Sequence, residues 1–96
     1  MKVLIVDDYP VARQVLRRIL ERLGAKQIVE ATDGRSALEA LGAAAWEFDL
    51  ILLDWTMPNM PGIEVARKLG QHPVGRRIPL IMVTGQSDPA RVAEAF

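Results

Sequence analysis

The stretch LILLDWTMPNMPG, residues 50–62, joins a short apolar run to one acidic residue and a proline-rich segment. Residues 50–53 are apolar throughout, which is typical of a strand buried on both faces of a parallel sheet. Asp54 ends this run. Pro58 and Pro61 remove backbone donors from the segment that follows, so we predict a loop there. In open α/β sheets such a loop, at the carboxyl end of a strand, is where ligands bind.

Three more short runs are predicted as strands, and the segments between them carry apolar residues at helical spacing. The predicted strands are residues 2–6, 27–31 and 79–83. The predicted helices are residues 10–23, 34–41 and 63–69, and a last helix begins near Ser87. The first of them begins at a proline and is followed by Gly24, as is common at helix ends.

This alternation implies parallel strands joined by right-handed crossovers, with helices on both faces of the sheet. The predicted fold class is therefore α/β, a flavodoxin-like doubly wound parallel sheet with strand order 2-1-3-4. In that order the first and third strands are neighbours across the point where the strand order reverses.

The composition excludes several classes of protein. Twelve basic side chains balance twelve acidic ones, so the net charge favours neither direct nucleic-acid binding nor a membrane surface. The chain has no cysteine, which excludes disulfides and thiolate metal sites. Its apolar runs fall short of the roughly 20 residues that span a bilayer, and no signal-peptide pattern precedes Asp7. We expect a cytoplasmic protein.

Three predicted strands lead into residues that can carry chemistry. Asp7 and Asp8 follow the first strand, Asp54 ends the third, and Thr84 follows the fourth. Because the carboxyl ends of parallel strands meet at one edge of the sheet, we expect three carboxylates and one hydroxyl in a single cleft.

Three clustered carboxylates repel one another, by roughly 4 kcal/mol for two unit charges about 4 Å apart at an effective dielectric of about 20. A shared proton or a bound cation would relieve this repulsion. Mg²⁺ prefers carboxylate and carbonyl oxygens and often binds beside a phosphate, whereas zinc prefers histidine and cysteine. We therefore expect Mg²⁺, with Mn²⁺ as a substitute, and phosphoryl chemistry in which a carboxylate attacks phosphorus.

The ordered set of segments resembles the receiver domain of two-component response regulators, and looks closest to chemotaxis-type receivers. The matching segments are VLIVDD at 3–8, ATDG at 31–34, LLDWTMPNMPG at 52–62 and PLIMVTG at 79–85. They cover nearly the whole chain in the correct order. The resemblance implies a phosphoacceptor module of a His-to-Asp phosphorelay, which is not an enzyme acting on a separate substrate.

The resemblance also implies a role for each residue of the expected cleft. Asp54 matches the phosphoacceptor. Asp8 matches the acidic residue that binds Mg²⁺ directly, and Asp7 matches its neighbour, which acts through a metal-bound water. Thr56 matches the residue whose backbone carbonyl is a metal ligand, and Thr84 matches the switch hydroxyl.

The chain departs from the family pattern at its end. Receivers carry a lysine after a fifth strand, and Lys2, Lys26 and Lys68 all lie in other segments. We therefore expect residues 1–96 to form one receiver domain that is incomplete at its C-terminus and lacks the fifth strand and fifth helix. The edge at residues 80–83 would then be exposed, and exposed apolar edges recruit other strands, so self-association is predicted.

A basic stripe lies on the first predicted helix, at Arg13, Arg17, Arg18 and Arg22. A solvated helix face is the commoner reason for such a stripe. The resemblance implies a sharper one, because receivers dock on a histidine kinase or phosphotransfer partner through this helix; Arg13, Arg17 and Arg18 would make that contact. No role is predicted for His72.

Two alternatives to a working phosphoacceptor remain open. The chain could be a truncated receiver-like scaffold, which binds metal or self-associates but switches poorly without the lysine. A flavodoxin-like or phosphohydrolase enzyme is the other. It has little support, because no glycine-rich phosphate loop follows the first strand and no second aspartate lies two residues after Asp54. Met57, Met60 and Met82 are expected to pack rather than to bind metal.

Overall fold

The computed structural model describes residues 1–55, 57 and 60–83. In chain order its elements are β1 (Lys2–Val6), α1 (Pro10–Arg22), β2 (Gln27–Ala31), α2 (Gly34–Ala43), β3 (Leu50–Asp54), α3 (Gly62–Gln71), the short 3-10 helix η1 (Gly75–Arg77) and β4 (Leu80–Val83). The helix predicted near Ser87 lies outside the described residues.

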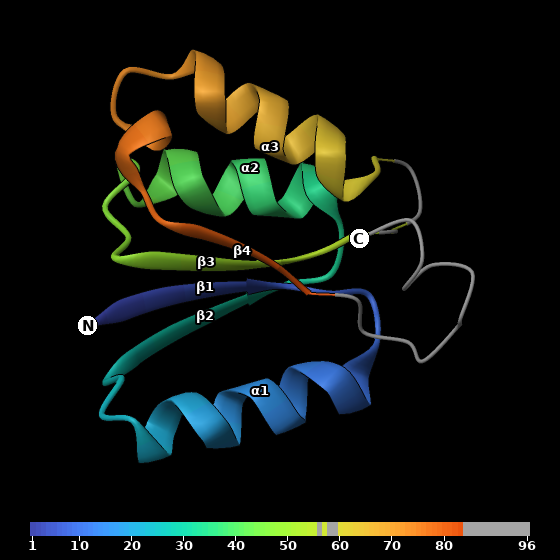
Figure 1. Ribbon diagram of the computed structural model, residues 1–96, viewed down its shortest axis with the longest axis vertical. Helices are drawn as coiled ribbons and strands as arrows, with labels where there is room; N and C mark the ends of the chain where they lie inside the picture. Colours follow the sequence, from blue (N-terminus) through green and yellow to red (C-terminus); the bar gives the residue numbers. More distant parts are fainter. Residues whose placement is uncertain (56, 58–59, 84–96) are drawn as a thin grey trace.

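The four strands form one parallel sheet in the order β2-β1-β3-β4. Figure 1 shows α1 against one face of this sheet and α2 and α3 against the other. The predicted α/β fold class and strand order are therefore confirmed. No helix in the described part of the chain is long and apolar enough to cross a membrane.

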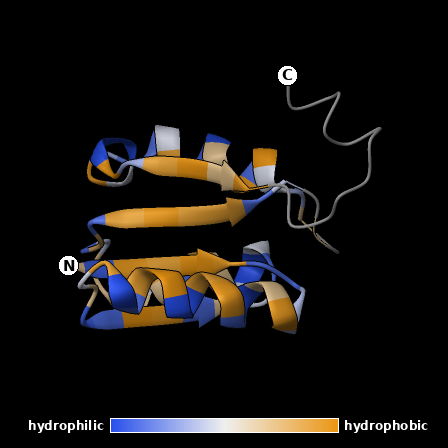
Figure 2. Ribbon diagram, turned by 60° about the horizontal axis from the view of Figure 1, so that its bottom comes forward, coloured by the Kyte–Doolittle hydropathy of each residue, from blue (hydrophilic) through white to orange (hydrophobic). Residues whose placement is uncertain are grey.

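The core lies in two layers, one on each side of the sheet, because the strands are apolar on both faces (Figure 2). The larger layer fills the space between the sheet and helices α2 and α3. It is built from Leu4, Val6, Ala31, Ala37, Leu41, Phe48, Ile51, Leu53, Met57, Val65 and Leu69. The smaller layer lies under α1 and contains Val3, Ile5, Leu20, Ala25 and Leu52.

Helix α1 buries less of its apolar stripe than its helical spacing suggests. Leu20 is only 4% exposed, but Val15 and Ile19 are 51% and 49% exposed. The reason is that α1 lies alone on its face of the sheet within the described residues, so only one side of the helix finds a partner (Figure 1). The other side, together with Ile81 of β4, stays open to solvent.

Two helix ends have the caps that their sequences indicate. Gly24 follows α1 with a φ of +95°, the left-handed conformation that suits glycine after a helix. At the start of α2, the Ser36 backbone N–H donates to Asp33 Oδ1 at 2.7 Å, and the Asp33 N–H donates to Ser36 Oγ at 3.2 Å. The bond from the Ser36 backbone and then the Ser36 side chain lower the pKa of Asp33 from its ordinary value of 3.8.

His72, to which the sequence assigned no role, makes a defined contact at the opposite edge of the sheet from the carboxyl ends of the strands. Its ring stacks on Trp46 with centroids 3.8 Å apart, and its Nδ1 accepts from the backbone N–H groups of Val74 and Gly75 at 3.1 Å each. Trp46 reaches this position with a φ of +62° just after α2. The contact therefore ties the end of α2 to the end of α3.

Candidate functional site

The predicted acidic residues meet at the carboxyl ends of β1 and β3. Val6 is paired with Leu53 in the parallel register, so Asp7 and Asp54 follow from the ends of neighbouring strands. Carboxylate oxygens of Asp7, Asp8 and Asp54 all lie within 4.8 Å of one another. We call these three residues the acidic cluster.

The acidic cluster is largely withdrawn from solvent, since Asp7 is 1% exposed and Asp54 is 4% exposed, whereas Asp8 is exposed. The Asp7 N–H donates to the carbonyl oxygen of Ala31 at 3.1 Å, which continues the pairing of β1 with β2. Its Oδ1 accepts from the Tyr9 N–H at 2.9 Å, directly before α1. The partial positive charge of the α1 N-terminus therefore faces the acidic cluster and partly offsets its negative charge.

Trp55 and Gly62, which follow β3 and begin α3, are joined by backbone hydrogen bonds to each other and to β4. The Trp55 N–H donates to the Val83 carbonyl at 3.2 Å, and the Gly62 N–H donates to the Trp55 carbonyl at 3.0 Å. Met57 is 5% exposed and packs in the larger core layer, and Met60 and Met82 pack against that layer. Packing is therefore confirmed as the role of these methionines.

Two predicted site residues, Thr56 and Thr84, lie outside the described residues. Their described neighbours lie at the acidic end of the sheet. Trp55 follows Asp54 directly, and Val83 is paired with Asp54 in the register of β3 and β4.

The acidic cluster offers only carboxylate oxygens, which are hard ligands. Mg²⁺ and Mn²⁺ accept such ligands, and Mg²⁺ typically uses one or two carboxylates while keeping several waters. One exposed and two buried carboxylates therefore fit a small divalent cation that stays open to solvent on one side.

The basic stripe on α1 has a structural partner that the sequence did not reveal. Arg13 and Arg17 both form ion pairs with Glu30 of β2, at 3.2 Å and 2.9 Å, while Arg18 is exposed. The pairing arises because β2 lies next to β1, under the first turns of α1. Glu30 belongs to a different element from its two arginines, so their separation in the sequence does not indicate an ion pair. An i,i+4 pair within one helix, in contrast, can be recognised from its spacing.

An open parallel sheet with an acidic cluster at the ends of its two central strands defines a class of doubly wound α/β protein. The family model of the response regulator receiver domain matches residues 3–96. The chain belongs to the response regulator receiver domain family.

Several characterised proteins are similar to the chain. The chemotaxis protein CheY of Pseudomonas aeruginosa is 36% identical over 95 residues, which cover 99% of this chain and 75% of that protein. The chemotaxis protein CheY1 of Helicobacter pylori is 36% identical over 96 residues, which cover 100% of this chain and 77% of that protein.

Solved structures with a similar fold include proteins of the same kind. The chemotaxis protein CheY4 of Vibrio cholerae superposes with a TM-score of 0.79 at 33% identity, covering 98% of this chain and 76% of that one. The signal receiver domain of a signal transduction histidine kinase from Syntrophus aciditrophicus gives a TM-score of 0.80 at 37% identity, covering 98% and 69%.

Proposed function

We propose that this receiver domain accepts a phosphoryl group on Asp54 with the help of a bound Mg²⁺, for which Mn²⁺ can substitute. Asp7, Asp8, Asp54 and the backbone carbonyl of Thr56 would hold the cation. The observation that carries the proposal is the acidic cluster, in which three carboxylates lie within 4.8 Å of one another at the carboxyl ends of β1 and β3. When bound, the cation would offset negative charge on the transferring phosphoryl oxygens.

In this phosphoryl transfer the protein mainly has to hold the Asp54 carboxylate and the cation in position. An oxygen of the Asp54 carboxylate forms a bond to phosphorus while the bond from phosphorus to the donor breaks, and the donor leaves with the electron pair. The product is an aspartyl phosphate. Thr84 would donate its hydroxyl to a phosphoryl oxygen as the switch residue. The chain is in this view a phosphoacceptor and not an enzyme with a separate substrate.

Intact mass tests this function directly. The chain is incubated with acetyl phosphate and Mg²⁺, with EDTA in a parallel sample, and Asp54→Asn is treated in the same way. We expect one phosphoryl group on the wild-type chain with Mg²⁺, and none with EDTA or on Asp54→Asn. A chain that binds Mg²⁺ yet gains no phosphoryl group would instead favour the alternative of a binding scaffold with impaired switching.

The natural phosphodonor is proposed to be a histidine kinase or a phosphotransfer protein in the cytoplasm. Receiver domains interact with partners of this kind, and a helix beside the phosphorylation site is a suitable contact surface. Arg18 is exposed on α1 and would meet an acidic patch of the partner. Arg13 and Arg17 would contribute less, because both are engaged with Glu30.

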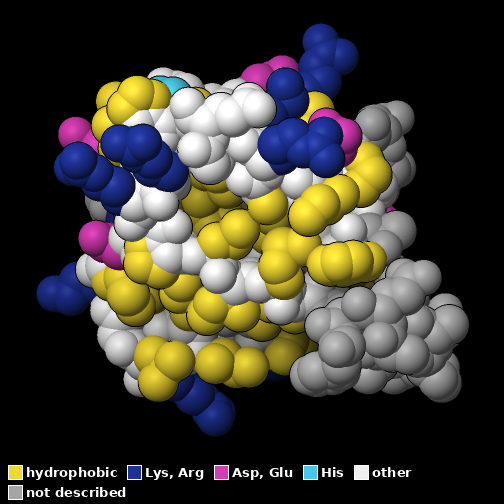
Figure 3. All heavy atoms as spheres, turned by 45° about the horizontal axis from the view of Figure 1, so that its top comes forward, with side chains coloured by type: hydrophobic (Ala, Val, Ile, Leu, Met, Phe, Trp, Pro, Cys, Tyr) yellow, Lys and Arg dark blue, Asp and Glu magenta, His cyan; other side chains and the backbone are white. Residues whose placement is uncertain are grey.

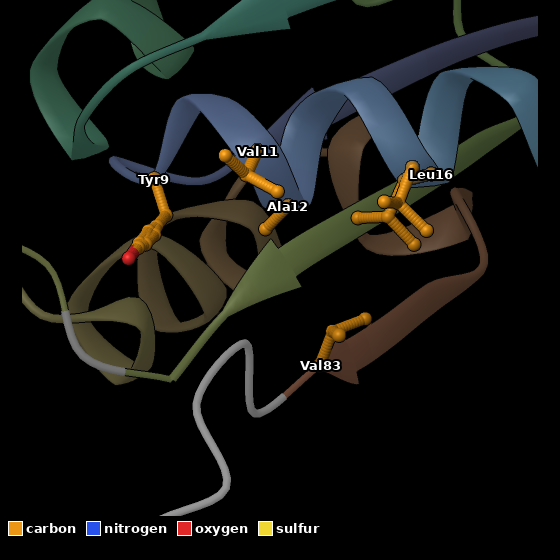
Figure 4. Close-up of a pocket in the computed structure, with 6 residues that line it drawn as sticks. Tyr9, Val11, Ala12, Leu16 and Val83 are labelled. Atoms are coloured by element: carbon orange, nitrogen blue, oxygen red, sulfur yellow. The ribbon is translucent and has the colours of Figure 1, made fainter.

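A second property, self-association, is supported by the surface beside β4. Figure 3 looks onto the β4 edge and shows hydrophobic side chains gathered across this face. Ile81 is 51% exposed, and Tyr9, Val11, Ala12, Val15, Leu16 and Val83 line an apolar pocket between α1 and β4 (Figure 4). Exposed apolar side chains gathered in one place favour association with another chain.

Light scattering over a range of concentrations tests this second proposal. We expect the mean mass of the wild-type chain to rise with concentration, and Ile81→Lys to suppress the rise because a charge on an edge strand opposes pairing. Ile63→Lys is the control, since Ile63 is 50% exposed on α3. A wild-type chain that stays monomeric, or equal effects of both substitutions, would count against association through β4.

A further inference from the structure

Arg13 reaches the backbone of the acidic cluster from α1. Its Nη1 donates to the carbonyl oxygen of Asp7 at 2.7 Å, the acceptor in the peptide that joins Asp7 to Asp8. Its Nε donates to Glu30 Oε1 at 3.2 Å. Since the guanidinium is planar and rigid, these two bonds fix its orientation together.

Glu30 is itself held in place by a second arginine. Arg17 Nε donates to Glu30 Oε2 at 2.9 Å, and Arg17 Nη2 donates to the Ile28 carbonyl at 3.2 Å. The two Glu30 oxygens thus serve one arginine each. Glu30 lies on β2 opposite Ile5 of β1, so the anchor for Arg13 belongs to the sheet and not to a loop.

The backbone of Asp7 is consequently held on both sides of its Cα, through the N–H of the preceding peptide and the carbonyl of the Asp7–Asp8 peptide. The Asp7 N–H donates to the Ala31 carbonyl of β2, and the Asp7 carbonyl accepts from Arg13. The exposed Asp8 follows directly, so the orientation of this peptide determines where its carboxylate stands relative to those of Asp7 and Asp54. The side chain of Arg13 is only 16% exposed, and its bond to the Asp7 carbonyl is part-buried.

We propose that Arg13, anchored on Glu30, is a positioning residue that holds the Asp7–Asp8 peptide in the orientation that a divalent cation requires. This inference rests on the proposed Mg²⁺ site. Removing a group that hydrogen-bonds to a metal ligand and orients it typically lowers metal affinity by about tenfold or more.

The sign of the effect separates this role from simple electrostatics. Arg13 carries a positive charge near a cation site, so charge alone would make its removal tighten Mg²⁺ binding. Positioning makes the opposite prediction, namely that Arg13→Gln weakens binding. Arg18→Gln is the matched control, because it removes the same charge from an exposed position of the same helix.

The test measures Mg²⁺ dissociation constants by NMR, from the amide signal of Asp8 and the indole N–H of Trp55, at a temperature where urea titration shows each variant to be folded. We expect Arg13→Gln to raise the dissociation constant about tenfold, Glu30→Gln to raise it less, and Arg13→Lys to restore part of the affinity. Arg18→Gln should leave binding unchanged or slightly tighter.

Two results would overturn the inference, and they are distinguishable. If wild-type signals do not titrate with Mg²⁺, the proposed metal site fails and the role of Arg13 fails with it. If the wild-type chain binds Mg²⁺ and Arg13→Gln binds equally well or more tightly, the metal site stands and only the positioning role is refuted.

Discussion

Gly62, the first residue of α3, lies against the backbone carbonyl of Asp54 so closely that a Cβ built on Gly62 would overlap that oxygen. The same residue donates its N–H to the Trp55 carbonyl at 3.0 Å. The start of α3 is therefore packed directly on the end of β3. This close packing at Asp54 requires that residue 62 has no side chain.

Gly62→Ala is expected to destabilise the chain by about 1–3 kcal/mol, because the backbone that a Cβ meets cannot move aside as a flexible side chain does. Helix propensity alone would favour alanine by about 1 kcal/mol. Urea unfolding decides between these effects. Gly70→Ala in the same helix is the control; its Cβ would meet nothing within 4 Å, so it should be stabilising by about 0.5 kcal/mol. A Gly62→Ala chain at least as stable as wild type would contradict the packing.

Charge repulsion in the acidic cluster leads to opposite effects of Asp8→Asn with and without Mg²⁺. Without the cation, removing the exposed Asp8 charge relieves repulsion with Asp7 and Asp54, so stability should rise by up to about 1 kcal/mol. With Mg²⁺ at about 100 times its dissociation constant, the wild-type chain should gain about 2.7 kcal/mol and Asp8→Asn clearly less.

Thermal unfolding with EDTA and with Mg²⁺ measures both effects. Glu47→Gln is the control, since Glu47 is exposed near the other end of the sheet, after α2, and should respond to Mg²⁺ as the wild-type chain does. Equal stabilisation of Asp8→Asn and the wild-type chain by Mg²⁺ would show that Asp8 does not help to hold the cation.

The cap at Asp33 is expected to make the folded chain less stable as the pH falls. The bond from the Ser36 backbone lowers the pKa of Asp33 below its ordinary value of 3.8, so the folded state favours the carboxylate. Its contribution is complete above the unfolded pKa of about 4 and is lost as pH falls through the lower folded pKa. Asp33→Asn keeps a capping oxygen but cannot titrate.

Unfolding measured between pH 7 and pH 3 should therefore show a smaller acid loss for Asp33→Asn than for wild type. Asp33→Ala removes the cap and should be less stable than Asp33→Asn at every pH. Identical pH profiles for wild type and Asp33→Asn would contradict the assigned cause.

The stacked pair of His72 and Trp46 is expected to support the fold without affecting the acidic cluster. His72→Ala removes the ring contact and the acceptor for the Val74 and Gly75 N–H groups, so it should cost about 1–2 kcal/mol. The contact follows the ends of α2 and α3, at the edge of the sheet opposite the acidic cluster. Urea unfolding should show the loss, and Mg²⁺ affinity should not change; a parallel loss of affinity would contradict this separation.

The fold was largely predictable because its determinants are local patterns and general topology rules. Apolar runs near residues 2–6 and 50–53 predicted β1 and β3, and the alternation of strands and helices, read as a flavodoxin-like sheet, predicted the strand order that the structure has. The meeting of Asp7 with Asp54 then follows, since the ends of neighbouring parallel strands share one edge.

The features that the sequence did not reveal depend on contacts between distant segments. Glu30 is 13 and 17 residues from its arginine partners, and nothing in that spacing marks an ion pair. The apolar stripe of α1 reads as buried, yet Val15 is half exposed, because burial depends on how many helices share a face. Pairing of His72 with Trp46 likewise requires the geometry of two helix ends.

Locating the phosphoryl group within the chain shows directly which carboxylate accepts it. After reaction with acetyl phosphate and Mg²⁺, reduction with borohydride converts an aspartyl phosphate to homoserine, and trypsin separates the candidates, since residues 3–13 carry Asp7 and Asp8 whereas residues 36–67 carry Asp54. If Asp54 is the phosphate acceptor, homoserine appears at position 54 alone, and only when Mg²⁺ was present. Homoserine at position 7 or 8, or at no position in a chain that binds Mg²⁺, would contradict that assignment.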